Sequence, residues 1–110
     1  MDIFHVETDE DGDTFVVRLF GELDLAAFER VESALASSTR PDVRIDMRGL
    51  TFIDSSGIRA VLAADARSKE QGGRLTIVPG ERQVHHVFVL TGLDSVLSFV
   101  EPDGVAEGRS

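Results

Sequence analysis

The hydrophobic residues of the chain follow two periods, which predict strands alternating with helices. Alternation of apolar and polar positions predicts strands over residues 3–8, 14–20, 43–47, 74–78 and, more weakly, 95–100. Apolar residues spaced three or four apart predict helices over 25–37, from Ser55 to the Gly72-Gly73 pair, and over 81–90. The Asp- and Gly-rich segment 9–13 predicts a turn between the first two strands.

This order of elements predicts a single α/β domain. Strand–helix–strand units connect parallel neighbours through right-handed crossovers, whereas the short first turn predicts an N-terminal antiparallel hairpin. The inner strands alternate instead of being apolar throughout. We therefore expect a mixed β-sheet of about five strands with helices mainly on one face. Residues 1–100 form the expected domain, and 101–110 form an expected flexible acidic tail with almost nothing to bury.

Composition narrows the classes of function. The 110 residues include no cysteine, which excludes a disulfide framework, a thiol nucleophile and a thiolate zinc site. Eleven basic and twenty acidic residues give a formal charge of -9, and such a surface repels nucleic-acid phosphates. The sequence shows neither a signal-peptide pattern nor a membrane-spanning apolar stretch. We expect a cytoplasmic protein that binds no membrane and no nucleic acid directly.

Motifs of enzymes and cofactor sites fit poorly. Asp54-Ser55-Ser56-Gly57 lacks the first glycine of a Gly-x-Ser-x-Gly nucleophile elbow. His85 and His86 are adjacent on a predicted helix and point about 100° apart, so they form no helical metal pair. The acids of 9–13 lack the spacing of an EF-hand loop. The single lysine, Lys69, lies in a predicted helix, unlike the lysine of a phospho-aspartate receiver. We expect no enzyme, metal or cofactor.

The Asp54–Gly57 segment places two hydroxyl groups at the start of a helix. Free backbone N–H groups and the positive end of the helix dipole lie there. Asp54 or Ser55 can be a simple N-cap, and spacing alone favours that structural role. If Asp54 is the cap, Ser55 is the first helical residue and its hydroxyl points outward. Asp24 is likewise a good N-cap for the helix that follows it.

Four ordered segments of the chain resemble the STAS domain family, specifically bacterial anti-sigma factor antagonists. They are Gly21-Glu22-Leu23-Asp24, Asp46-Met47-Arg48-Gly49-Leu50, Phe52-Ile53-Asp54-Ser55-Ser56-Gly57-Ile58 and Val87-Phe88-Val89-Leu90-Thr91-Gly92-Leu93. The resemblance covers about residues 3–100. It implies a STAS-like α/β domain that is a regulatory binding module without catalytic activity.

The resemblance also implies a phosphorylation switch. In that family the first serine of the motif, here Ser55, is phosphorylated by a partner that is both a serine kinase and an anti-sigma factor. The unphosphorylated protein binds this partner and frees the sigma factor, and a PP2C-type phosphatase restores it. Such switches regulate transcription in stress response and sporulation. The implied partner-binding residues are Asp24, Asp54, Ser55, Ser56, Gly57 and Arg59.

The sequence departs from the family pattern at two places, and it leaves two other functions open. Arg59 occupies a position where the family often has a small residue, and we expect it to reach a phosphate or a partner acid. The family's final helix is short or missing here. The sequence leaves open a STAS domain that is not switched, as a scaffold subunit of a sensory or lipid-transport complex. Direct binding of a small ligand or nucleotide also stays open.

Overall fold

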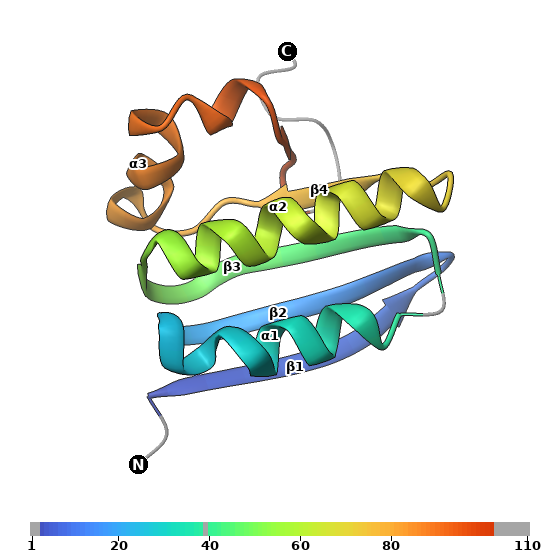
Figure 1. Cartoon of the computed structure of the whole chain (residues 1–110), viewed down its shortest axis with the longest axis horizontal. Coiled ribbons are helices and arrows are strands. Elements are labelled where there is room, and N and C mark those ends of the chain that lie inside the picture. Colours follow the sequence, from blue (N-terminus) through green and yellow to red (C-terminus); the bar gives the residue numbers. More distant parts are fainter. Residues whose placement is uncertain (1–2, 39, 103–110) are drawn as a thin grey trace.

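A mixed sheet with strand order β1-β2-β3-β4-β5 lies at the centre of the computed structural model, which describes residues 3–38 and 40–102 (Figure 1). β1 runs antiparallel to β2, and every other pair of neighbours is parallel. This arrangement confirms the predicted fold class. The strands are β1 (Phe4–Asp11), β2 (Thr14–Leu23), β3 (Asp42–Ile53), β4 (Leu75–Val78) and β5 (Ser98–Phe99).

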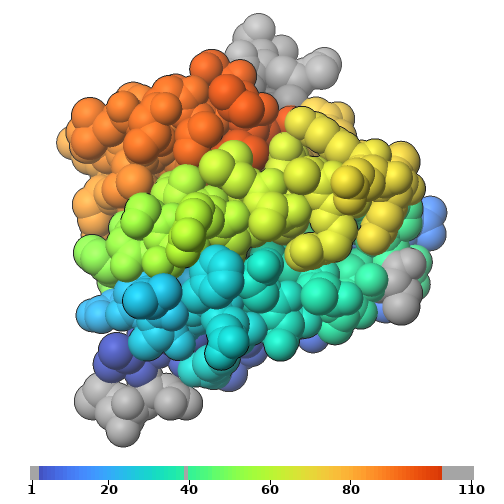
Figure 2. Space-filling view, in the orientation of Figure 1, coloured from blue at the N-terminus to red at the C-terminus, as the bar shows by residue number. Residues whose placement is uncertain are grey.

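Helices α1 and α2 lie side by side against one face of the sheet (Figure 1). Figure 2 shows their side chains in contact along this face of the molecule. Helix α3 follows β4 and lies beyond the end of that strand (Figure 1). The helical elements are a 3-10 turn η1 (Leu25–Ala27), α1 (Phe28–Ala36), α2 (Ser55–Glu70), α3 (Arg82–Leu90) and a second 3-10 turn η2 (Leu93–Ser95).

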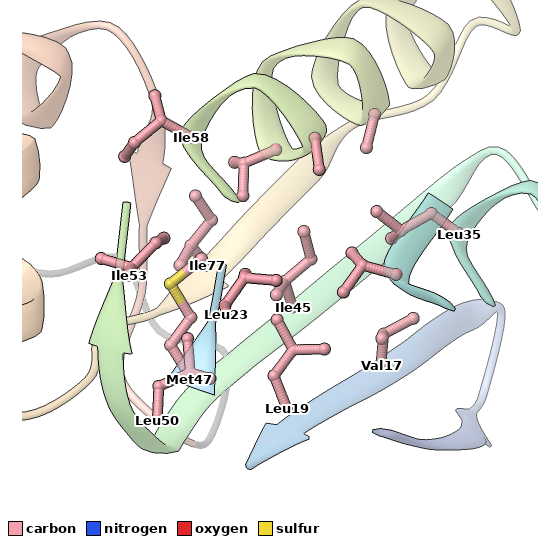
Figure 3. Packing of buried hydrophobic residues seen from close by; sticks show 14 of the residues in the cluster. Val17, Leu19, Leu23, Leu35, Ile45, Met47, Leu50, Ile53, Ile58 and Ile77 are labelled. Carbon is pink, nitrogen blue, oxygen red and sulfur yellow. The ribbon is translucent and has the colours of Figure 1, made fainter. Parts of the chain in front are cut away.

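The buried core forms where the apolar positions of the inner strands face α1 and α2. Figure 3 shows side chains of both layers pointing into this shared interior. Ala60 and Ala64 of α2 are buried, and their small side chains allow α2 to lie close to the sheet. The strands contribute the fully buried side chains Val17, Leu19, Leu23, Ile45, Met47, Leu50, Leu75 and Ile77.

β1 is longer than the sequence pattern predicted. It continues through Asp11, so the predicted turn over 9–13 is wrong except at Gly12 and Asp13. The acidic residues remain in the strand because each pairs with a β2 residue, and arginines of neighbouring segments offset their charge. Gly12 has φ +62°, a left-handed conformation suited to the tight turn.

β3 is also longer than predicted, and it carries the chain directly to the motif. The pattern predicts its end at Met47 and a loop after it, but the strand continues to Ile53. β2 extends in parallel to Leu23, and register shifts after Arg18 and Gly21 accommodate the irregular segment. The loss of simple alternation at these shifts hid the strand from the sequence pattern.

The C-terminal part of the domain is less regular than predicted. Only Ser98 and Phe99 of the predicted strand over 95–100 are in β5, and Ser95 belongs to η2. Of the predicted tail, residues 103–110 lie outside the described part of the chain.

The first predicted helix is also less regular than expected. The segment predicted as a helix over 25–37 begins as the 3-10 turn η1 and becomes α-helical only at Phe28.

The sheet face opposite α1 and α2 carries ion pairs. Arg18 lies 3.6 Å from Asp9, Arg44 lies 3.3 Å from Asp11, and Arg48 Nη2 lies 2.6 Å from Asp46 Oδ2. Burial of Asp46 alone would raise its pKa. Hydrogen bonds from the side chain and backbone of Arg48, with the charges of Arg48 and Arg18, outweigh burial and lower the pKa of Asp46 below its ordinary value of 3.8.

Arg48→Gln is therefore expected to lower stability in a pH-dependent way. The folded-state pKa of Asp46 lies below its unfolded value, so the pair stabilises the fold above that value, and the contribution is lost as pH falls through the folded pKa. Because the Arg48 side chain is 56% exposed, we expect a loss of only about 1 kcal/mol near neutral pH. Urea unfolding of both proteins at neutral and acidic pH checks this, and an equal difference at both would contradict it.

Candidate functional site

The carboxyl ends of β2 and β3 bring two aspartates to the same edge of the sheet. Leu23 and Ile53 are paired at the ends of these parallel strands, and the Asp54 N–H donates to the Leu23 carbonyl at 3.2 Å. Asp24 and Asp54 follow directly and have nearly identical extended backbones, with φ/ψ of -120°/-171° and -118°/-171°. The two strands therefore deliver η1 and α2 from adjacent positions (Figure 1).

Both aspartates cap the helical segments that follow them, as predicted. Asp24 Oδ1 accepts from the Ala27 N–H at 3.2 Å. Asp54 Oδ1 accepts from the N–H groups of Ser56 at 2.9 Å and Gly57 at 3.3 Å. Because the Asp54 carboxylate supplies the cap, α2 does not need the Ser55 hydroxyl to begin.

Ser55 is the first residue of α2 and is exposed. Its hydroxyl makes no hydrogen bond to any residue that the structure describes. Ser56, in contrast, is buried with a relative exposure of 7%. Of the two hydroxyls in the motif, only that of Ser55 is therefore presented to an incoming protein.

Gly57 holds the first turn of α2 directly against the ends of the two strands. A Cβ atom on this residue would lie 2.7 Å from Ile53 Cγ1 and 2.8 Å from Leu23 Cγ. Leu23 and Ile53 are themselves buried beneath α2 (Figure 3). The missing side chain of Gly57 therefore allows the start of α2 to lie close to the sheet. Ser56 and Gly57 form the buried side of this first turn, opposite the exposed Ser55.

Arg59 lies one helical turn after Ser55 and is exposed. Its guanidinium carbon lies 5.8 Å from the centre of the Phe28 ring on α1. Arg59 forms no ion pair with any of the residues in the described ranges. A positive charge thus lies one helical turn from the Ser55 hydroxyl, at the same sheet edge as the two capping carboxylates of Asp24 and Asp54.

Two exposed apolar side chains at this edge were missed by the sequence analysis. Leu25, next to Asp24, is 68% exposed, and Phe52, two residues before Asp54, is 47% exposed. The sequence pattern assigned neither residue to the surface, and apolar character alone predicts burial. Their place near the two capping aspartates, where strands end and helical segments begin, was the available signal.

His85 packs with aromatic residues of the core. The His85 ring packs edge-to-face on Phe99 with centres 4.8 Å apart and also lies 6.4 Å from Phe88, so it extends the aromatic core. Within residues 3–38 and 40–102, no group of three or more His, Cys, Asp or Glu side chains is placed to hold a metal ion. None of the helices in those ranges has the length and apolar character needed to cross a membrane.

Sequence comparison finds relatives over most of the chain. A family model described as "Mlab, STAS domain" matches residues 6–101. The anti-sigma F factor antagonist of Lysinibacillus sphaericus is 33% identical over 85 residues, which are 74% of this chain and 73% of that protein.

Solved structures share the fold. An anti-sigma factor antagonist from Mycobacterium paratuberculosis has a TM-score of 0.78 at 21% identity, covering 90% of this chain and 86% of that one. The anti-sigma factor antagonist SpoIIAA in its unphosphorylated form has a TM-score of 0.73 at 26% identity over 90% of each chain. The phosphorylated form of SpoIIAA, from Bacillus, has a TM-score of 0.71 at 24% identity, covering 90% and 94%. On the match of the family model and the identity to a curated relative, this chain belongs to the STAS domain family.

Proposed function

We propose that this chain is an anti-sigma factor antagonist that binds an anti-sigma factor with serine kinase activity and is released when that kinase phosphorylates Ser55. The observation that carries the proposal is the division of roles at the start of α2. Asp54 caps the helix, and Ser55 is left exposed. The relatives support it, because one of them is an anti-sigma F factor antagonist and a structural neighbour has been solved with and without phosphate.

The covalent step needs only a partner enzyme and ATP. The Ser55 oxygen attacks the γ-phosphorus of ATP, the bond to the ADP oxygen breaks, and a base of the kinase accepts the hydroxyl proton. A PP2C-type phosphatase reverses the modification by adding water across the phosphate ester, which returns the hydroxyl and releases inorganic phosphate. The chain itself supplies the acceptor hydroxyl and acts as a regulatory binding module in the cytoplasm.

The same position makes phosphate compatible with the fold and incompatible with the complex. A phosphoserine adds a charge of about -1.5 to -2, which the positive end of a helix dipole stabilises. In a complex, that charge would be buried near the carboxylates of Asp24 and Asp54. One nearby cation can offset only part of this charge, and the remainder, if it is buried unpaired, costs roughly 3–5 kcal/mol, which is enough to dissociate a complex of moderate affinity.

The surface around Ser55 indicates the chemistry of the partner. Leu25 and Phe52 offer exposed apolar groups, and Asp24 and Asp54 add negative charge beside them. A complementary partner surface has apolar pockets surrounded by basic residues. The ATP site of a kinase, whose basic groups hold phosphates, can present such a surface next to the hydroxyl that it modifies.

Mass spectrometry tests the site of modification. The full chain is incubated with ATP and each candidate anti-sigma kinase encoded in the same genome, and phosphate is mapped to a residue. We expect one phosphate on Ser55, none in Ser55→Ala, and continued modification of Ser55 in Ser56→Ala. A kinase that binds the chain but transfers no phosphate to Ser55 would overturn the switch and favour a scaffold that is not switched.

A further inference from the structure

We infer that Arg59 is the intramolecular partner of a phosphate on Ser55, and that it exchanges the Phe28 ring for this phosphate when the chain is modified. The inference rests on the proposed function, because it concerns the regulation of the same residue. It assigns Arg59 a positioning role within the chain, whereas the other residues of the candidate site cap the helix, support it or face the partner.

The helix geometry places Arg59 within reach of the modified hydroxyl. Ser55 is the first residue of α2 and Arg59 is the fifth, so they are an i, i+4 pair on one helix face with Cβ atoms about 5–6 Å apart. Side chains on a helix lean toward its N-terminus, which directs the long Arg59 side chain back toward Ser55. An acidic group four residues before a basic one is also the more favourable order for such a pair.

The state of Arg59 in the unmodified chain indicates that its guanidinium is available. Its charge contacts the Phe28 ring at 5.8 Å, and no carboxylate among the described residues pairs with it. The Phe28 ring is half-buried, and a solvent-accessible cation over such a ring is held weakly, whereas a phosphate can accept two parallel, charge-assisted hydrogen bonds from a guanidinium. Most other arginines in the described ranges are committed to carboxylates, namely Arg18, Arg40, Arg44, Arg48 and Arg67.

The neighbouring acids do not compete strongly for Arg59. Asp24 and Asp54 already accept hydrogen bonds from the backbone N–H groups of their own capped turns. A phosphate would therefore be the strongest acceptor within one helical turn. Its pairing with Arg59 would leave the Phe28 ring uncovered, so phosphorylation would change the surface beside Ser55 in shape as well as in charge.

A titration followed by phosphorus NMR tests the pairing. Phosphoserine is incorporated at position 55 of the full chain during synthesis, so the experiment needs no kinase. Because Arg59 favours the dianion, we expect the titration midpoint in Arg59→Gln to lie about 0.15–0.4 pH unit above that of the wild type at low salt. Arg59→Lys is expected to retain part of the lowering, since it keeps the charge.

Arg74→Gln is the matched control. Arg74 is exposed and precedes β4, so it lies at the end of the parallel strands opposite Ser55, and its substitution removes the same charge. A midpoint in Arg59→Gln no higher than in Arg74→Gln would overturn the inference. That result would leave the proposed function intact, whereas failure of any kinase to modify Ser55 would overturn the proposed function and leave this titration unaffected.

Discussion

Ser55→Asp is expected to weaken binding to the anti-sigma kinase at least about 100-fold, because it places a carboxylate in the contact surface where a phosphate would lie. The fold should tolerate the same change. Ser55 is exposed and Asp54 supplies the cap, so no native hydrogen bond of the described residues is lost. A carboxylate in the first helical turn is stabilising by about 0.3–1 kcal/mol, so the unfolding midpoint should be unchanged or a few degrees higher.

Ser55→Ala distinguishes a structural role of the Ser55 hydroxyl in capping the helix from its proposed role as a phosphate acceptor. It removes the acceptor hydroxyl without adding charge, so it should bind the kinase with near wild-type affinity and remain unmodified. Isothermal calorimetry and thermal unfolding of the three proteins check this. A clear fall in the unfolding midpoint of Ser55→Asp or Ser55→Ala would support a structural role for the hydroxyl and contradict the switch.

Leu23→Ala is expected to destabilise the fold by about 2–5 kcal/mol, a large part of the roughly 5–15 kcal/mol typical of a domain. The Leu23 side chain is fully buried, and its Cγ lies beneath Gly57 at the start of α2. Truncation leaves a cavity where the ends of β2 and β3 support the helix. Urea unfolding should show a much lower midpoint with an m-value near that of the wild type.

Leu25→Ala is the matched control, since it removes the same atoms two residues away. Leu25 is 68% exposed, so its truncation should change stability by less than about 0.5 kcal/mol. It should instead weaken binding to the kinase about tenfold, as expected for an apolar contact in an interface. Equal losses of stability in the two variants would contradict the burial that the structure assigns to them.

The parts of the fold that rest on local pattern were predicted from sequence. Alternation of Val43, Ile45 and Met47 identified an inner strand, and Asp54 was identified as a candidate cap because its side chain acts within its own turn. The continuation of β3 to Ile53 was missed, because it depends on register shifts and on pairing with β2. Local pattern contains no information about such a partner.

At the candidate site, too, local sequence pattern did not predict features that depend on tertiary contacts. The exposure of Ser55 followed from the cap, but the contact between Arg59 and Phe28 joins two helices that are distant in sequence. The exposure of Leu25 and Phe52 was likewise missed, since apolar character alone predicts burial. Residues that act through tertiary contacts therefore became visible only when α1, α2 and the strand ends were placed together.

At this site, the group that stabilises the helix is distinct from the group that we propose is modified. The Asp54 carboxylate accepts hydrogen bonds from the backbone N–H groups, and Gly57 allows the first turn of α2 to lie against the strand ends. Ser55 is exposed and is not needed for either contact. Such a separation allows a charge to be added and removed without refolding, so that binding alone responds. The proposed switch is thus a local electrostatic change on a rigid scaffold.

The most direct test is calorimetric titration of the proposed anti-sigma kinase with two forms of the 110-residue chain, one unmodified and one carrying phosphoserine at position 55. The account predicts tight binding of the unmodified form and affinity reduced at least about 100-fold for the phosphorylated form. Equal affinity for the two forms would contradict it.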